Sequence, residues 1–129
     1  MKRITQAEFD ALLVVNERKQ CPGHTDYSAL KSFPEGCDFG PGCDFAVGCR
    51  FGPRCYFAVG CRFGPRCDFG PRCIFGPRCY FAALCHFGPR CDFGPQCHFA
   101  AGCIFQVLDE LLAREDLALW ERQILESWK

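Results

Sequence analysis

Cysteine recurs at every sixth residue through the middle of this chain, and that period constrains the fold more than any other feature. Twelve cysteines stand six residues apart from Cys37 to Cys103, and a phenylalanine follows each of them two residues later, from Phe39 to Phe105. The unit reads Cys-x-Phe-[Gly/Ala]-[Pro/Val/Ala]-x. Because an α-helix turns once every 3.6 residues, a period of six would spread the phenylalanines around a helix. The period therefore argues against a helix over residues 37–105.

Each unit instead predicts a short strand followed by a corner. Residues i and i+2 of a strand point to the same side, so Cys and Phe face inward together while the residue between them faces outward. The next three residues, often Gly-Pro-Arg, then turn the chain. Proline costs little at a corner, since it interrupts no ladder hydrogen bond there. Repetition of such strands and corners builds an all-β solenoid.

The corner sequences themselves repeat at every third unit. One class of units has Gly-Pro-Arg at each of its places, residues 52–54, 70–72 and 88–90. When every fourth unit is compared instead, the Gly-Pro-Arg corners are spread more evenly over the classes. A three-sided coil made of three units is therefore favoured over a four-sided coil made of four. The twelve units would then form about four coils, roughly 19 Å tall at ~4.8 Å per layer.

This pattern resembles the hexapeptide-repeat family of left-handed parallel β-helices, and the resemblance covers residues 33–105. It implies a left-handed triangular parallel β-helix in which Cys takes the small inward place. The chain departs from the family pattern by carrying Phe where the family has Leu, Ile or Val. The alternative is a four-sided right-handed solenoid of the pentapeptide-repeat kind, but the unit of that family is one residue shorter.

The flanking segments predict helical caps, which divide the chain into residues 1–36, 37–105 and 106–129. Thr5-Gln6-Ala7-Glu8 fits a capping box, so we expect a short helix near residues 5–18. Glycine and proline make residues 19–36 a loop that leads into the first coil.

Apolar residues after Phe105 follow a helical spacing and predict an amphipathic helix over about 107–127. This helix would cover the last coil or join subunits. We expect a dimer or trimer, and the family resemblance implies trimers. An apolar corner column would be the matching contact on the solenoid. The candidate interface residues are Val47, Ala83, Ala101, Leu117, Trp120, Ile124 and Trp128.

Thirteen cysteines in a chain of 129 residues first suggest a secreted disulfide scaffold. Their spacing favours packing instead, because an inward Cys is a small apolar side chain that fits beside Phe. In-register stacking would hold Cβ atoms just beyond the ~3.5–4.5 Å of a disulfide. Metal binding is the other alternative, but no Cys-x₂-Cys pair occurs. We expect no metal, no cofactor, and a reducing cytoplasmic location.

Charge limits the partners of this protein. Fifteen basic and fifteen acidic residues cancel, which argues against general nucleic-acid binding and a membrane surface. No apolar run is long enough to cross a membrane. Locally, seven Arg and four Asp give residues 37–105 a charge of +3, whereas six acidic and three basic residues give 106–129 a charge of −3.

Arginine is concentrated at one predicted corner. Arg54, Arg72 and Arg90 would stack there about 4.8 Å apart, with Arg50 nearby. Other units have glycine at this place, which indicates a positive φ that costs a non-glycine residue ~1–2 kcal/mol. Guanidinium suits phosphate or carboxylate. The column is therefore either an anion- or nucleotide-binding site or a solubilising surface balanced by aspartates.

A non-catalytic binding protein is the function we expect. The family resemblance implies acyltransferases and a zinc-dependent carbonic anhydrase that use histidine at subunit boundaries. His86 and His98 are two units apart, so they would lie on different sides of the triangle. The unbroken Cys-x-Phe-Gly repeats also resemble uncharacterised phage and prophage proteins, which implies binding to a host defence protein. The alternatives are an anion- or nucleotide-binding β-helix and an acyltransferase-like enzyme.

Overall fold

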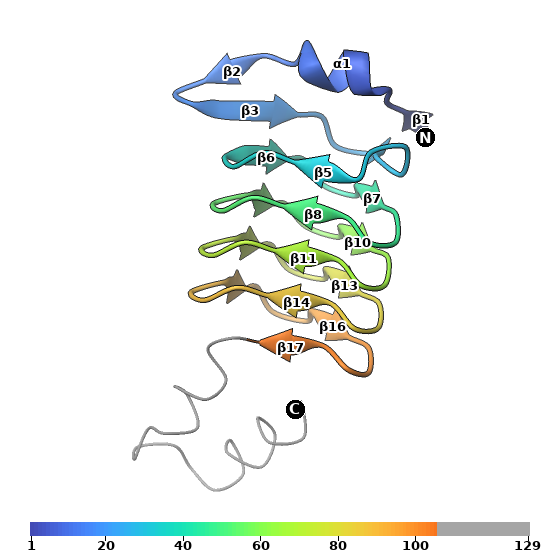
Figure 1. The fold of residues 1–129 in the computed structure, drawn as a ribbon, viewed down its shortest axis with the longest axis vertical. Helices are drawn as coiled ribbons and strands as arrows, with labels where there is room; N and C mark the ends of the chain where they lie inside the picture. Colours follow the sequence, from blue (N-terminus) through green and yellow to red (C-terminus); the bar gives the residue numbers. More distant parts are fainter. Residues whose placement is uncertain (106–129) are drawn as a thin grey trace, which may run out of the picture.

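Residues 1–105, the part of the chain that the computed structural model describes, form a three-sided parallel β-solenoid of about five coils (Figure 1). From β3 (Arg18–Cys21) to β17 (Ile104–Phe105), successive strands belong in turn to three sheets, which we name B, A and C. One corner separates each strand from the next.

The three sheets run the length of the solenoid, and each contains one strand from every coil. Sheet A contains, in spatial order, β1 (Lys2–Arg3), β4 (Thr25–Asp26), β7 (Asp44–Phe45), β10 (Arg62–Phe63), β13 (Tyr80–Phe81) and β16 (His98–Phe99). Sheet B contains β2 (Val14–Val15), β3, β6 (Cys37–Phe39), β9 (Tyr56–Phe57), β12 (Ile74–Phe75) and β15 (Asp92–Phe93). Sheet C contains β5 (Ser32–Phe33), β8 (Arg50–Phe51), β11 (Asp68–Phe69), β14 (His86–Phe87) and β17.

The register confirms the predicted coil of three units. Phe63 of β10 pairs in parallel with Phe45 on one side and with Phe81 on the other, and these partners lie three units before and after it. The Arg62 N–H donates to the Cys43 carbonyl at 2.8 Å, and the Gly64 N–H donates to the Phe45 carbonyl at 3.0 Å. Equivalent residues of successive coils therefore stack directly above one another.

The expectation of four coils was one too low, and the loop expected over residues 19–36 is in fact most of the first coil. The strands β3, β4 and β5 pair with the next coil in sheets B, A and C. The cysteine signal is missing from this coil, because Lys19 and Thr25 stand at places that Cys37 and Cys43 occupy one coil later.

The N-terminal helix begins as predicted but ends early. In α1 (Gln6–Asp10), the Thr5 hydroxyl accepts from the Glu8 N–H and the Glu8 carboxylate accepts from the Thr5 N–H, as a capping box requires. The helix expected to reach residue 18 stops at Asp10. The chain instead enters a hairpin of β2 and β3, which needs positive φ at Asn16 and Glu17 (51° and 65°). The C-terminal helix expected over 107–127 lies outside the described residues.

Phe9 of α1 closes the N-terminal end of the core. Its ring packs edge-on against Phe33 at 5.4 Å and against Tyr27 at 6.4 Å between centroids. Cys21 occupies the place in this coil that Phe39 occupies in the next. Since cysteine is much smaller than phenylalanine, its presence leaves room for the ring that α1 supplies.

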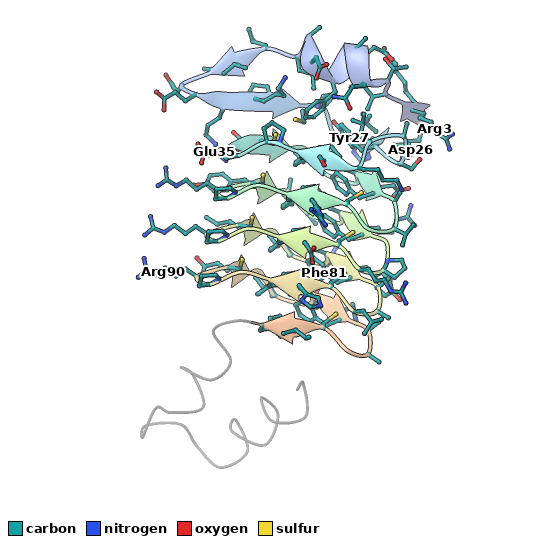
Figure 2. The ribbon with its side chains drawn as sticks, viewed as in Figure 1. Arg3, Asp26, Tyr27, Glu35, Phe81 and Arg90 are labelled. Carbon is teal, nitrogen blue, oxygen red and sulfur yellow. The ribbon has the colours of Figure 1, made fainter. Side chains whose placement is uncertain are left out.

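Phenylalanine rings fill the triangle in a regular lattice. Rings one coil apart lie parallel, as for Phe63 and Phe81, whose centroids are 4.8 Å apart and whose planes differ by 3°. Rings one unit apart meet edge to face, as for Phe75 and Phe81 at 4.9 Å and 85°. Both arrangements are favourable for aromatic pairs. Figure 2 shows Phe81 within this stack.

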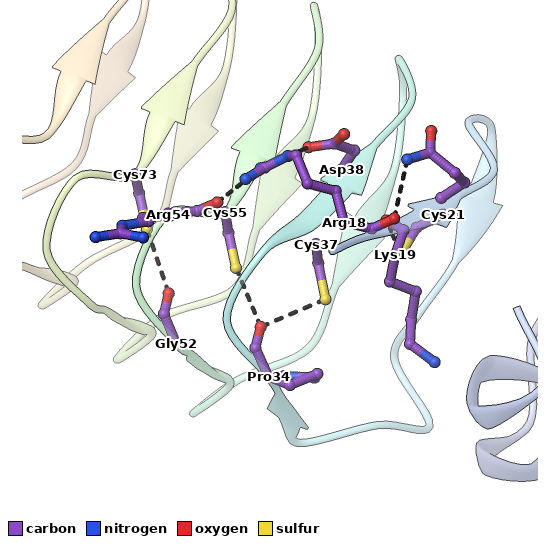
Figure 3. A network of polar contacts seen from close by, with 11 residues as sticks. Arg18, Lys19, Cys21, Pro34, Cys37, Asp38, Gly52, Arg54, Cys55 and Cys73 are labelled. Atoms are coloured by element: carbon purple, nitrogen blue, oxygen red, sulfur yellow. Dashed lines mark hydrogen bonds and ion pairs between the residues drawn. The ribbon is translucent and has the colours of Figure 1, made fainter. Parts of the chain in front are cut away.

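The cysteines pack inside this lattice and also satisfy the corner carbonyls. Every cysteine is a free thiol. From Cys55 onward, each thiol donates to a corner carbonyl of the preceding coil, as Cys73 does to Gly52 at 3.5 Å (Figure 3). These carbonyls belong to the fourth residue of each unit, directly after Phe. Among residues 1–105, the backbone hydrogen bonds between coils leave them without a backbone N–H donor. Hydrogen bonding to Cys61 and burial raise the pKa of Cys79 far above its usual range, so its thiol keeps the proton it donates.

Candidate anion-binding groove

The corner between sheets C and B carries the three Gly-Pro-Arg corners predicted to stack. These corners directly follow β8, β11 and β14, and β11 pairs in register with both β8 and β14. Arg54, Arg72 and Arg90 therefore form a column along the solenoid axis, with a layer spacing of about 4.8 Å. Figure 2 shows Arg90 projecting outward at this edge, with Glu35 toward its N-terminal end.

All three arginines adopt the left-handed backbone conformation expected from the glycines of other units. Their φ angles are 60°, 62° and 63°, close to the 68° of Gly42 and the 71° of Gly48. A non-glycine residue there costs ~1–2 kcal/mol. Hydrogen bonds between coils hold the conformation, since the Arg54 N–H donates to the Pro71 carbonyl at 3.0 Å.

An open groove of about 550 Å³ follows this corner. The side chains of Arg54, Arg72 and Arg90 are exposed, and none of them forms an ion pair with any acid of residues 1–105. Two like charges about 4 Å apart repel by roughly 1 kcal/mol in water. The column is therefore unfavourable both in backbone conformation and in charge. The groove is lined by Glu35, Pro53, Arg54, Pro71, Arg72, Pro89 and Arg90.

Arg18 belongs to the same column, and sequence reasoning missed it. It precedes Gly36 by one coil and Arg54 by two. Its guanidinium donates to the Arg54 carbonyl at 2.7 Å and to the Asp38 carboxylate at 2.7 Å (Figure 3). It also lies over the Tyr56 ring, 3.8 Å from the centroid.

Arg18 holds the backbone of the groove at Arg54 and adds no unpaired charge, because Asp38 pairs with it. The hydrogen bond to Asp38 raises the pKa of Arg18 above its usual value. Gly36, at φ 72°, has no side chain in the path of Arg18 to the Arg54 carbonyl. The regular spacing of positions 18, 36, 54, 72 and 90 would have revealed Arg18, had the first coil been recognised.

The remaining predicted site residues lie elsewhere. Arg50 is on the flat face of sheet C, in register with Ser32 and Asp68, and does not line the groove. His86 is on sheet C and His98 on sheet A, so the structure does not bring them together on one face.

The predicted interface residues are only partly within the described chain. Val47, Ala83 and Ala101 stand at equivalent places of the corner between sheets A and C, and the side chain of Val47 is exposed. Leu117, Trp120, Ile124 and Trp128 lie outside the described residues.

Two other kinds of feature are absent from residues 1–105. No three His, Cys, Asp or Glu side chains gather there in a way that could hold a metal ion. No helix in that part of the chain is long and apolar enough to cross a membrane.

Comparison with known proteins identifies no relative. No protein-family model, no curated protein and no solved structure matches the chain. The corner groove is therefore the observation that bears most directly on function.

Proposed function

We propose that this protein acts by binding and not by catalysis, and that the groove along Arg54, Arg72 and Arg90 holds anionic groups of its partner. The observation that carries this proposal is the column itself. Three successive coils place arginine in a conformation that glycine adopts without strain, and no acid of residues 1–105 forms an ion pair with any of the three. A bound carboxylate or phosphate would remove the repulsion and accept paired N–H groups.

The alternative is that arginine is simply the surface residue of a repeated unit. Arg66 and Arg78 support it, since both are at positive φ on other corners. At those corners, however, the equivalent residues of the neighbouring coils are not arginine. Three arginines in succession occur only at the groove within residues 37–105, which favours binding over solubility. The other two columns read Gly48, Arg66, Leu84 and Gly102, and Gly42, Gly60, Arg78 and Gln96.

The finer assignments belong to the same proposal. A three-sided coil of three hexapeptide units supports placing the chain among left-handed hexapeptide-repeat β-helices. A phage-encoded protein that binds a host defence protein would use the groove for acidic or phosphorylated groups of its target.

Replacing the three groove arginines by glycine tests the proposal without threatening the fold. For Arg54→Gly, Arg72→Gly and Arg90→Gly together, we expect the affinity for an acidic peptide or tripolyphosphate to fall roughly 100-fold, because all three charge-assisted contacts are lost. Relief of backbone strain should meanwhile raise the free energy of unfolding by about 1–3 kcal/mol. Calorimetric titration and urea denaturation measure the two effects.

A second triple variant supplies the matched control. Arg50→Ala, Arg66→Gly and Arg78→Gly also remove three positive charges, two of them at positive φ. This variant should bind within a few-fold of the parent. Equal weakening in both triple variants, or a parent protein that binds neither probe, would show that the groove is not an anion site.

A further inference from the structure

An apolar strip runs beside the arginine column. Tyr56 follows Arg54 by two residues and Ile74 follows Arg72 by two, and both face outward from sheet B. They pair in register on adjacent coils, and their exposed fractions are 41% and 40%. The groove and the strip therefore span the same coils, side by side.

Carboxylates border this surface at its N-terminal end and beside its third coil. In sheet B the outward column reads Asp38, Tyr56, Ile74, Asp92, because each residue pairs in register with the next. Glu35 lines the N-terminal end of the groove. A long polyanion that continued past Arg54 toward the N-terminus would meet Glu35 and the ion pair of Asp38 with Arg18. The arginine column within the described residues is about 10 Å long, the distance from the first to the third of three layers at ~4.8 Å each.

Spacing then distinguishes the kinds of chain that could present the negative charges. Three arginines stand at about 0, 4.8 and 9.6 Å along the axis. Residues i, i+3 and i+7 of an α-helix share one face and rise by about 0, 4.5 and 10.5 Å. Same-face residues of an extended strand recur at about 6.7 Å, so a third acid would overshoot Arg90 by several ångströms. The column matches a helix better than a strand.

Resting on the function proposed above, we infer that the partner is a protein segment that forms an acidic amphipathic α-helix along this corner. Three acids of the helix contact Arg54, Arg72 and Arg90, and its neighbouring apolar residues pack on Tyr56 and Ile74. Arg18 is a positioning residue for this surface, because it bonds the Arg54 carbonyl and stacks on the Tyr56 ring.

Two helical peptides of identical composition test the inference against the full-length protein. The first has Glu at i, i+3 and i+7 with Leu on the adjoining face, and the second has the same residues with Glu moved to opposite faces. We expect the first to bind roughly ten-fold more tightly, since only it presents three acids in line. Ile74→Ala should weaken the first peptide several-fold and leave tripolyphosphate binding unchanged, because that anion has no apolar face.

Other outcomes separate this inference from the proposed function. If both peptides bind equally and the triple Arg→Gly variant still loses them, the groove binds anions but the helix inference is wrong. If single-stranded DNA binds more tightly than the in-line peptide, the partner is a nucleic acid and the inference is likewise overturned. If neither peptide, DNA nor tripolyphosphate binds, both the inference and the proposed function fall.

Discussion

Replacing Phe81 by alanine should lower the free energy of unfolding by about 3–5 kcal/mol. The side chain is fully buried, and its ring stacks between Phe63 at 4.8 Å and Phe99 at 5.0 Å. Its ring also has edge contacts with Phe75 and Phe87, both at 4.9 Å, and more distant ones with Phe69 and Phe93 at 5.7 and 5.9 Å. Because in-register strands fix these neighbours, they cannot move in to fill the cavity. Urea denaturation followed by circular dichroism measures the loss.

Phe93→Ala is the matched control for this substitution. Phe93 belongs to the same lattice but lies in the last described coil and is only partly buried. Replacing Phe93 should lower the free energy of unfolding clearly less than replacing Phe81, because less of the Phe93 side chain is buried in the folded protein. If Phe81→Ala cost under about 1 kcal/mol, the assignment of a stacked aromatic core would be wrong.

Replacing Gly70 by alanine should cost about 1–3 kcal/mol through crowding at the groove corner. A Cβ added there would lie 2.7 Å from the Pro53 nitrogen of the preceding coil. It would also precede Pro71, whose Cδ crowds the Cβ of the preceding residue. The repeat itself supports this expectation. Glycine precedes every proline at the fifth place from Pro41 onward, whereas alanine at the fourth place always precedes Val or Ala. Urea denaturation measures the cost.

A double substitution shows which of the two contacts matters. Ala82 stacks on Gly64 of the preceding coil in the neighbouring corner, so stacking on the preceding coil does not by itself exclude a methyl group. Gly70→Ala with Pro71→Ala reproduces the Ala82-Ala83 corner and should recover about 1 kcal/mol or more of the loss. A double variant no more stable than Gly70→Ala alone would contradict this explanation.

Much of the solenoid follows from a few repeated residues. The six-residue spacing of Cys and Phe predicts the strands, and the recurrence of Gly-Pro-Arg predicts the three-sided coil. The glycines at Gly42 and Gly48 predict the positive φ of the arginines. Each prediction succeeds because a buried or strained place accepts few residue types, so the constraint is visible in the sequence.

The first coil and the role of Arg18 could not be predicted in the same way. The first coil tolerates Lys19, Thr25 and Tyr27 at places that later coils give to Cys and Phe. These substitutions break the period, so the segment reads as a loop. Arg18 precedes the first recognised repeat, and its contacts depend on stacking with a residue two coils away.

The most direct test of the binding site observes the arginines themselves. In a spectrum of the ¹⁵N-labelled full-length protein, the Nε–H signals of Arg54, Arg72 and Arg90 should shift when the in-line acidic helix is added, because their guanidinium groups gain carboxylate partners. The signals of Arg50 and Arg66, which lie outside the groove, should stay in place. Shifts spread over all the arginines, or confined to those outside the groove, would contradict the assignment of this corner as the binding site.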